Sequence, residues 1–388
     1  MSQEDGSTSS SLGRAFEILQ EPVTMIMSSD SGSLPFFGDE RRFLEGAVRY
    51  RIRPEEVSAS YFARTVVKGF LDKVEAGIDV PTYPQFRDMN DMFLQMLGGI
   101  EKGEEGYVET DCLSLKMNRA QIPEVAAIRA NSKQIREKTG QPFRARVCIT
   151  GPYTLSSLFA YRDKQIFQRL GTLISRIIET NLFNEKHGGV ELVTLDEPVF
   201  GLQDDALIDY GSEGRKNLRR AWQSILEKAN SKGVRRALHL HSTADELFWE
   251  VDALDVIESH VDDPIYEMKK TLRQLESTDK FLKASICIVN FDELIKSRII
   301  ASLEKETSES VLNQRIAEVW TSIKSGTINP TAFVEDTELM KKRLTQIVDR
   351  FGVERIPYAG PECGLRGFPS CGSAMECLRR VSTTIENA

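Results

Sequence analysis

The sequence predicts an α/β fold, a single (β/α)8 barrel with a helical insertion before the last strand. Short runs with strand character alternate with longer segments of helical period, and about eight such units fit into roughly 360 residues. Polar, glycine-bearing and thiol residues follow the strand-like runs, where a barrel of this kind carries its chemistry. The alternation favours the barrel over an open doubly wound sheet.

Eight runs are predicted as strands because β-branched and other apolar residues are concentrated in them and loop residues end them. These runs cover residues 22–28, 77–83, 145–150, 191–196, 236–241, 253–258, 283–289 and 355–360.

The intervening segments are predicted as amphipathic helices, since their apolar residues recur every three or four positions with charged residues between them. Residues 302–333 exceed one helix and indicate an inserted helical pair or lid. A polar, serine-rich stretch over 1–20 predicts a flexible N-terminus, so the barrel is expected to occupy 21–388. The clearest helical segments are 54–77, 164–186, 213–230 and 336–352.

The composition and charge of the chain limit the kinds of molecule that it can bind. The formal net charge is -8 with a pI near 5.4, which argues against a general nucleic-acid or anionic-membrane surface. No signal-peptide pattern or run of about 18 apolar residues is present, so we expect a cytoplasmic protein with a small-molecule or protein partner. Of the six cysteines, four (Cys112, Cys148, Cys287 and Cys363) are far apart in sequence, which indicates reduced thiols rather than a disulfide framework.

Unusual residues follow most of the predicted strands. In a barrel these positions meet at the C-terminal rim, so their side chains are expected to converge. The segments are GSLP (32–35), PQFRDM (84–89), TGPYTL (150–155), DEP (196–198), HLHS (239–242), ESH (258–260) and PECGL (361–365).

Three of the four histidines belong to this set. Side chains two residues apart on a strand point to the same face, so His239 and His241 can bind one ion. The next strand end supplies His260 or Glu258, and a late loop supplies Cys363. A thiolate with imidazoles favours Zn²⁺ over Mg²⁺ or Ca²⁺, which prefer oxygen ligands.

Structural roles remain open for the same residues. The histidines can be satisfied by backbone groups or exposed at strand ends, and Cys363 can be a small buried apolar residue. The DEP segment can be a helix cap and turn, while Arg87 and Asp88 can form a surface ion pair. Residues 150–155 can simply start a helix, and neither GxxxxGK[ST] nor GxGxxG occurs.

In their order along the chain these motifs resemble the C-terminal catalytic barrel of cobalamin-independent methionine synthase and its shorter archaeal and bacterial relatives. That superfamily includes coenzyme M methyltransferases. The resemblance extends from the GSLP loop to PECGL, which is similar to the family's PDCGLK. It includes the aGiD strand, continued here as AGIDVPTYPQFRDM, followed by TGP-x-T and DEP.

The resemblance implies a zinc site held by an H-x-C strand end, a glutamate after the next strand and the cysteine of PDCGL. Here His241 stands at the first cysteine position, and His260 rather than Glu258 aligns with the glutamate. Both departures introduce another zinc ligand. The expected set is therefore His239, His241, His260 and Cys363, with Glu258 as a substitute fourth ligand.

The implied activity is zinc-dependent methylation of a small thiol, with homocysteine favoured as the acceptor. By family analogy Ser33 meets the carboxylate and Asp196, beside Glu197, meets the amino group. Gln85 replaces the more usual glutamate, and Arg87 leaves open a sulfonate thiol such as coenzyme M. A further alternative is a non-catalytic metal-binding barrel.

The methyl donor is expected to be methylcobalamin, a corrinoid protein or methyl-folate. The chain has room for only one barrel, whereas full-length members of the family carry a second that helps to hold the folate. This absence favours a corrinoid donor.

Overall fold

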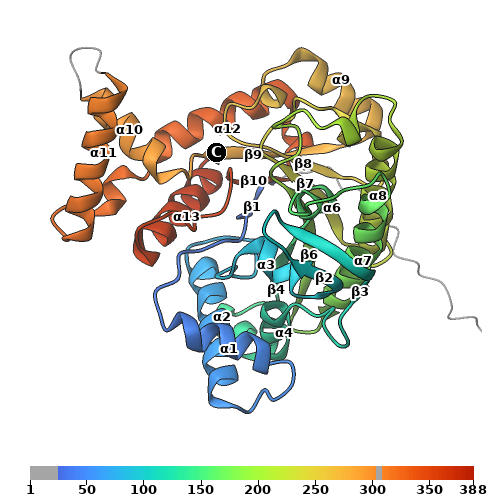
Figure 1. The fold of residues 1–388 in the computed structure, drawn as a ribbon. Coiled ribbons are helices and arrows are strands. Elements are labelled where there is room, and N and C mark those ends of the chain that lie inside the picture. The colour runs from blue at the N-terminus through green and yellow to red at the C-terminus, as the bar shows by residue number, and fades with distance from the viewer. Residues whose placement is uncertain (1–24, 303–307) are drawn as a thin grey trace, which may run out of the picture.

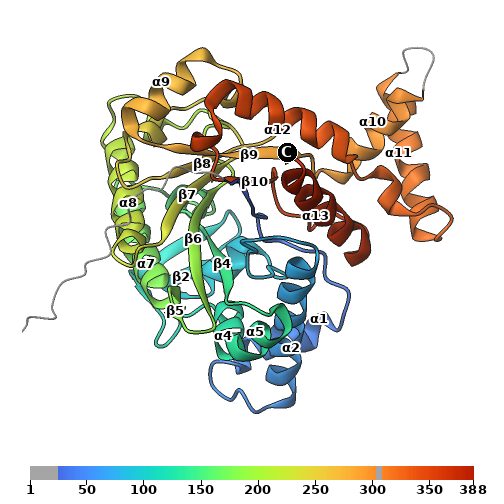
Figure 2. The ribbon, with the colours of Figure 1, turned by 180° about the vertical axis from the view of Figure 1, so that it is seen from behind.

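The fold is a curled parallel sheet that forms a half-barrel with helices around it, as seen in a computed structural model of the chain (Figure 1). The structure describes residues 25–302 and 308–388. The predicted α/β class is confirmed, and the expectation for 1–20 lies outside the described residues. Seen from behind, the helices cover the outer face of the sheet (Figure 2).

The main sheet has the order β1-β10-β9-β8-β7-β6-β4, and all neighbours along this path are parallel. The short β5 (Asn184–Glu185) adds an antiparallel pair to β6. The strands of the path are β1 (Met27–Ser28), β4 (Phe143–Thr150), β6 (Gly188–Glu197), β7 (Arg235–Leu240), β8 (Val256–Glu258), β9 (Phe281–Cys287) and β10 (Tyr358–Pro361).

Residues 77–83, predicted as the second strand, form no regular strand. Pro81 and Pro84 have no backbone N–H group, so a continuous ladder cannot form there. The segment makes isolated contacts instead: Val80 N donates to Ser28 O at 3.0 Å, and Arg146 N donates to Pro81 O at 2.9 Å. It therefore lies between the two edge strands, but the assigned sheet is not closed.

The four clearest helical predictions are confirmed by α2 (Val57–Glu75), α7 (Ile166–Asn181), α8 (Glu213–Asn230) and α12 (Thr337–Phe351). Their apolar faces pack against the sheet or neighbouring helices. The other helices are α1 (Glu40–Arg49), α3 (Met89–Leu94), α4 (Pro123–Ala130), α5 (Ser132–Thr139), α6 (Pro152–Ser156), α9 (Lys269–Thr278), α10 (Phe291–Ala301), α11 (Glu309–Lys324) and α13 (Cys371–Glu386).

Two features lie outside the repeating pattern. The segment predicted as an insertion contains α11 and a short 3-10 turn at Pro330–Phe333, and α10 and α11 project together from the barrel (Figure 1). An antiparallel hairpin of β2 (Leu97–Lys102) and β3 (Tyr107–Leu115) was not predicted from the sequence.

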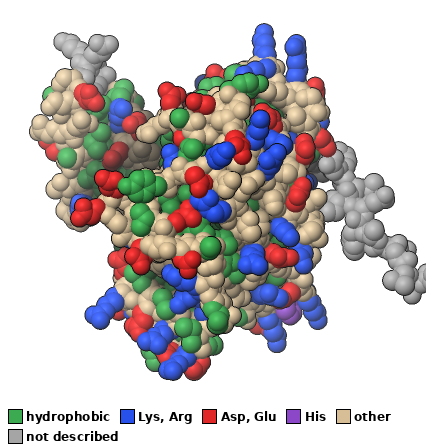
Figure 3. All heavy atoms as spheres, turned by 45° about the vertical axis from the view of Figure 1, so that its right-hand side comes forward, with side chains coloured by type: hydrophobic (Ala, Val, Ile, Leu, Met, Phe, Trp, Pro, Cys, Tyr) green, Lys and Arg blue, Asp and Glu red, His purple; other side chains and the backbone are tan. Residues whose placement is uncertain are grey.

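The buried side chains are mostly aliphatic and aromatic, and the six cysteines are free. On the face shown in Figure 3, positive and negative side chains are interspersed. Among residues 25–302 and 308–388, no helix has the length and apolar character needed to cross a membrane.

Candidate metal centre

The four side chains expected as metal ligands lie together at one end of the sheet. His239 is on β7, His241 follows that strand, and His260 follows β8. Cys363 lies in the loop after β10. Because these strands are parallel, residues far apart in sequence meet at a single rim.

One ligand atom from each residue can be chosen so that all four lie within 4.8 Å of one another. The Cys363 Sγ to His241 Nε2 distance is 3.6 Å. Around Zn²⁺, neighbouring tetrahedral N and S ligand atoms are about 3.3–3.8 Å apart, so the widest pair exceeds that range by at most about 1 Å. The four side chains are therefore already close to the arrangement that a zinc ion would need.

Unpaired nitrogen atoms support the fit of a metal ion to this group. Both ring nitrogens of His239 and Nε2 of His260 are buried without a hydrogen-bond partner. A buried polar atom without a partner costs about 1–3 kcal/mol, and a bound cation would offset that cost. Three nitrogens and one sulfur form a donor set that zinc accepts.

The environment keeps the imidazoles neutral. Burial, with the charge of neighbouring His260, lowers the pKa of His241 to about 4. Burial also lowers the pKa of His239 well below its usual value and lowers that of His260. Because metal binding needs the neutral ring, these nitrogens are available at neutral pH.

Cys363 is the one member that must lose a proton. Burial, reinforced by the Asp196 and Glu362 carboxyls, raises the pKa of its thiol to about 11. Without a cation the thiol is therefore protonated at neutral pH, and a bound metal ion would have to displace that proton.

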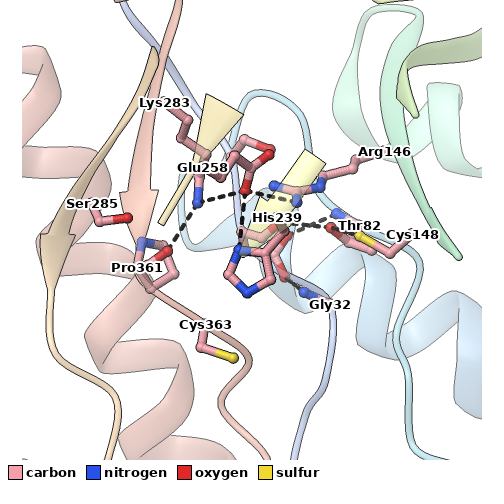
Figure 4. A network of polar contacts seen from close by, with 12 residues as sticks. Gly32, Thr82, Arg146, Cys148, His239, Glu258, Lys283, Ser285, Pro361 and Cys363 are labelled. Atoms are coloured by element: carbon pink, nitrogen blue, oxygen red, sulfur yellow. Dashed lines mark hydrogen bonds and ion pairs between the residues drawn. The ribbon is translucent and has the colours of Figure 1, made fainter. Parts of the chain in front are cut away.

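Glu258 is near the four side chains, but its carboxylate pairs with two buried cations. Its Oε2 accepts a hydrogen bond from Arg146 Nη2 at 2.9 Å and lies 3.3 Å from Lys283 Nζ. Burial alone would raise the pKa of Glu258, but Arg146 and Lys283 outweigh it and lower the pKa. The same oxygen lies 3.8 Å from His239 Nδ1, and Figure 4 shows this imidazole between the carboxylate and Cys363.

A pocket of about 210 Å³ opens beside His239, His241 and Cys363. Four of the five residues expected to contact substrate line it: Ser33, Gln85, Arg87 and Asp196. Asp88, Met89, Pro198 and Gly364 also line it and belong to the motifs expected at the rim, while Ser31 and Arg366 lie outside those motifs.

The loop that carries Ser31 and Ser33 is fixed from beneath. Asp30 accepts from Gly32 N at 3.0 Å and pairs with the buried Lys73 Nζ at 2.6 Å. Gly32 has φ +100°, and an added Cβ would lie 2.7 Å from Gln85 Oε1, so this position requires glycine.

Asp196 presents an unsatisfied carboxyl to the pocket. Its Oδ1 is buried and has no hydrogen-bond partner. Burial, with the nearby carboxylates Glu258 and Glu197, raises its pKa to about 8. A cationic substrate group beside it would favour the ionised form.

Glu197, expected beside Asp196 as a substrate contact, does not line this pocket. Its carboxylate accepts hydrogen bonds from Tyr153 N at 2.9 Å, Thr154 N at 2.6 Å and Trp222 Nε1 at 2.8 Å. These bonds hold the start of α6, so Glu197 has a structural role in a helix that follows β4, whereas the sequence left open a cap and turn formed by the DEP segment itself.

The two arginines of the pocket differ in their pairing. Arg87 donates from Nε and Nη2 to the Glu124 carboxylate, both at 2.7 Å, and the pair is largely buried. Arg366 has a side chain 53% exposed and lies 3.7 Å from Asp88 Oδ2. It directly follows the PECGL segment, which was the only signal for it in the sequence.

No protein-family profile matches the chain, and no curated protein matches it. Among solved structures, the chain is similar to a B12-independent methionine synthase from Shewanella sp. W3-18-1 in complex with selenomethionine. The match covers 94% of this chain and 97% of the synthase chain, at 14% sequence identity and a TM-score of 0.59. A methyltransferase from Methanosarcina mazei is similar over 95% of both chains, at 12% identity and a TM-score of 0.53.

A Listeria monocytogenes protein, assigned as a candidate vitamin-B12-independent methionine synthase, is similar to 95% of this chain and 99% of its own. The identity is 14% and the TM-score 0.54. These likenesses show the fold that the chain shares with methionine synthase-like and methyltransferase structures.

Proposed function

We propose that the protein is a zinc-dependent thiol S-methyltransferase that converts homocysteine to methionine. The observation that carries the proposal is the convergence of His239, His241, His260 and Cys363 beside a pocket that contains the unpaired Asp196 carboxyl. The similar solved structures support the same class of reaction. In this proposal residues 80–85 occupy the position of the eighth strand and complete the barrel.

Zinc held by these four residues would supply Lewis acidity, which lowers the pKa of an incoming thiol. Asp196 would bind the substrate ammonium group, and the loop with Ser33 would face the carboxylate. The pocket would exclude water and orient the thiolate sulfur toward the methyl carbon. Sulfur then forms the new bond as the methyl group leaves the donor.

The pairing of Arg87 favours an amino-acid thiol over a sulfonate thiol. A guanidinium that binds sulfonate has to present free N–H groups, whereas Arg87 uses two of its nitrogens for Glu124. A thiol without an ammonium group would offer no cation for the Asp196 carboxylate to bind. Coenzyme M is therefore the second acceptor to test.

The test is a matrix of methyl donors and acceptors with zinc-loaded protein. Homocysteine and coenzyme M would each be combined with methylcobalamin and methyl-folate, and the methylated thiol measured. We expect methionine as the product. If the protein binds zinc but methylates neither thiol, the proposed activity is wrong and the protein is a non-catalytic metal-binding barrel.

Matched cysteine variants test the metal site itself. Cys363→Ser removes the sulfur ligand, and we expect zinc affinity to fall by more than about 100-fold, beyond the loss typical of groups that only support a ligand. Cys371→Ser removes an exposed thiol outside the four-residue group and is the control. Equal zinc content in the two variants would contradict the assignment.

A further inference from the structure

Two buried cysteines that the proposed function does not use are in contact with each other. Cys287 is the last residue of β9, and Cys377 is on α13, 90 positions further along the chain. Their Sγ atoms are 3.4 Å apart, and neither residue is exposed to solvent. All six cysteines lie in the described part of the chain, and no other pair among them shares a sulfur–sulfur hydrogen bond.

The distance between the two sulfurs is short enough for a bond to form between them. A disulfide bond is about 2.05 Å long, so the 3.4 Å contact has to shorten by roughly 1.4 Å. Rotation about the two Cα–Cβ bonds can supply this movement without a shift of the backbone.

The pair joins two parts of the chain that flank the loop carrying Cys363. On one side the carbonyl oxygen of Cys287 accepts a hydrogen bond from Glu362 N at 3.0 Å. On the other side the loop of residues 363–370 leads directly into α13. A bond between Cys287 and Cys377 would therefore hold this loop at both ends.

The surroundings make the pair slow to react. The hydrogen bond with Cys377, reinforced by burial, raises the pKa of Cys287 well above its usual value. Because the thiolate is the reactive form of cysteine, we expect the exposed Cys112 and Cys371 to be oxidised first.

A pocket close to the pair gives a small oxidant a way in. This pocket of about 610 Å³ lies beside β9 and is lined by Ser285 and Arg343. Arg343 donates from Nη1 to Ile286 O at 3.0 Å, so one wall of the pocket is bound to the residue next to Cys287. A solute as small as hydrogen peroxide can reach the sulfurs from there when the structure opens locally.

The contact between the sulfurs decides the product of oxidation. Once peroxide converts one thiol to a sulfenic acid, the second sulfur is already in place, so condensation within the pair precedes attack by another peroxide molecule. Cys112 and Cys371 are exposed and have no sulfur neighbour, so they stay open to further oxidation.

We propose that Cys287 and Cys377 are an oxidation site, at which hydrogen peroxide forms a disulfide that fastens α13 to β9 and restrains the loop of residues 363–370. The inference does not depend on the proposed function. One sulfur attacks a peroxide oxygen, the O–O bond breaks and water leaves. The second sulfur then displaces the hydroxyl group of the sulfenic acid as a second water molecule. Two electrons and both thiol protons thus pass to the peroxide.

Peptide mapping tests the site. The full-length protein with added zinc would be treated with hydrogen peroxide, alkylated after denaturation and digested with trypsin. We expect a cross-link between peptides 284–296 and 367–379, which a reductant removes with a gain of about 2 Da. Since the second peptide contains both Cys371 and Cys377, Cys371→Ser is the matched control and should keep the cross-link. Cys377→Ala should abolish it.

Amide hydrogen exchange measures the restraint on the loop. We expect exchange over residues 363–370 to slow after peroxide treatment of the wild-type protein and of Cys371→Ser, but not of Cys377→Ala. Exchange that the cross-link leaves unchanged would overturn the restraint.

The peptide map of the wild-type protein can overturn the site without any variant. The proposal fails if Cys287 and Cys377 are both still alkylated once Cys112 and Cys371 are fully oxidised. It also fails if Cys287 is joined to another cysteine, or if the pair is converted to sulfinic acids instead of a disulfide.

Discussion

Glu258 and His260 are two residues apart in sequence but occupy different environments. Glu258 neutralises the buried Arg146 and Lys283, while His260 has an unpaired Nε2 beside Cys363. This contrast favours the imidazole over the carboxylate as the fourth ligand.

Paired variants separate the two roles. We expect His260→Ala to lower zinc affinity by more than about tenfold with a modest change in stability. Glu258→Gln should keep zinc but lower the free energy of unfolding by about 3–5 kcal/mol, because it leaves two buried cations without their carboxylate. Metal titration and urea denaturation measure these effects, and zinc loss confined to Glu258→Gln would reverse the assignment.

If zinc binds as proposed, the Cys363 thiol will determine how its affinity depends on pH. The pKa of this thiol is raised to about 11, so a metal ion has to displace one proton from it. The pKa of His241 is lowered to about 4, so this imidazole carries no proton that would have to be displaced near neutral pH. Zinc affinity should therefore rise about tenfold per pH unit between about pH 6 and 9. Competition with a chelator of known affinity measures the slope, and a slope near zero would show that the thiol is not a ligand.

Asp196 and Glu197 are adjacent on β6, and strand alternation turns them to different neighbours. Asp196 Oδ1 has no partner, whereas Glu197 accepts three hydrogen bonds, two of them from the start of α6. One strand thus supplies a carboxyl that lines the pocket and a carboxyl that holds the start of α6.

We expect Glu197→Gln to lower the free energy of unfolding by about 1–3 kcal/mol, since its amide group faces N–H donors. Zinc content should not change. Asp196→Asn should instead keep stability and weaken homocysteine binding by about tenfold or more, through loss of a charge-assisted hydrogen bond. Denaturation and calorimetry test both, and weaker homocysteine binding only in Glu197→Gln would exchange the two roles.

Periodicity in the sequence was sufficient for the main helices and for most strands of the sheet. It was insufficient at residues 77–83, because strand-like composition does not reveal how Pro81, with Pro84 just after the segment, interrupts the ladder. The β2–β3 hairpin was missed because its exposed, polar residues carry little hydrophobic alternation.

At the scale of the molecule, parallel strands explain why motif order was informative about the site. Each strand-end motif contributes to one rim, so the four candidate ligands converge although they span residues 239–363. Pairings across the fold were beyond prediction: Glu124 neutralises Arg87 from 37 positions away, and Arg366 reaches the pocket from the last loop.

Two pockets adjoin the candidate metal centre. One pocket contains Asp196, and the other is lined by Trp320 of α11. The candidate metal centre lies where they adjoin, at Cys363 and Gly364.

X-ray absorption spectroscopy of the zinc-loaded protein, before and after addition of homocysteine, tests the central claim most directly. We expect one sulfur at about 2.3 Å and three nitrogens at about 2.0–2.1 Å, with a second sulfur appearing when the thiol is added. A zinc shell without sulfur in the resting protein, or one that homocysteine leaves unchanged, would contradict the account.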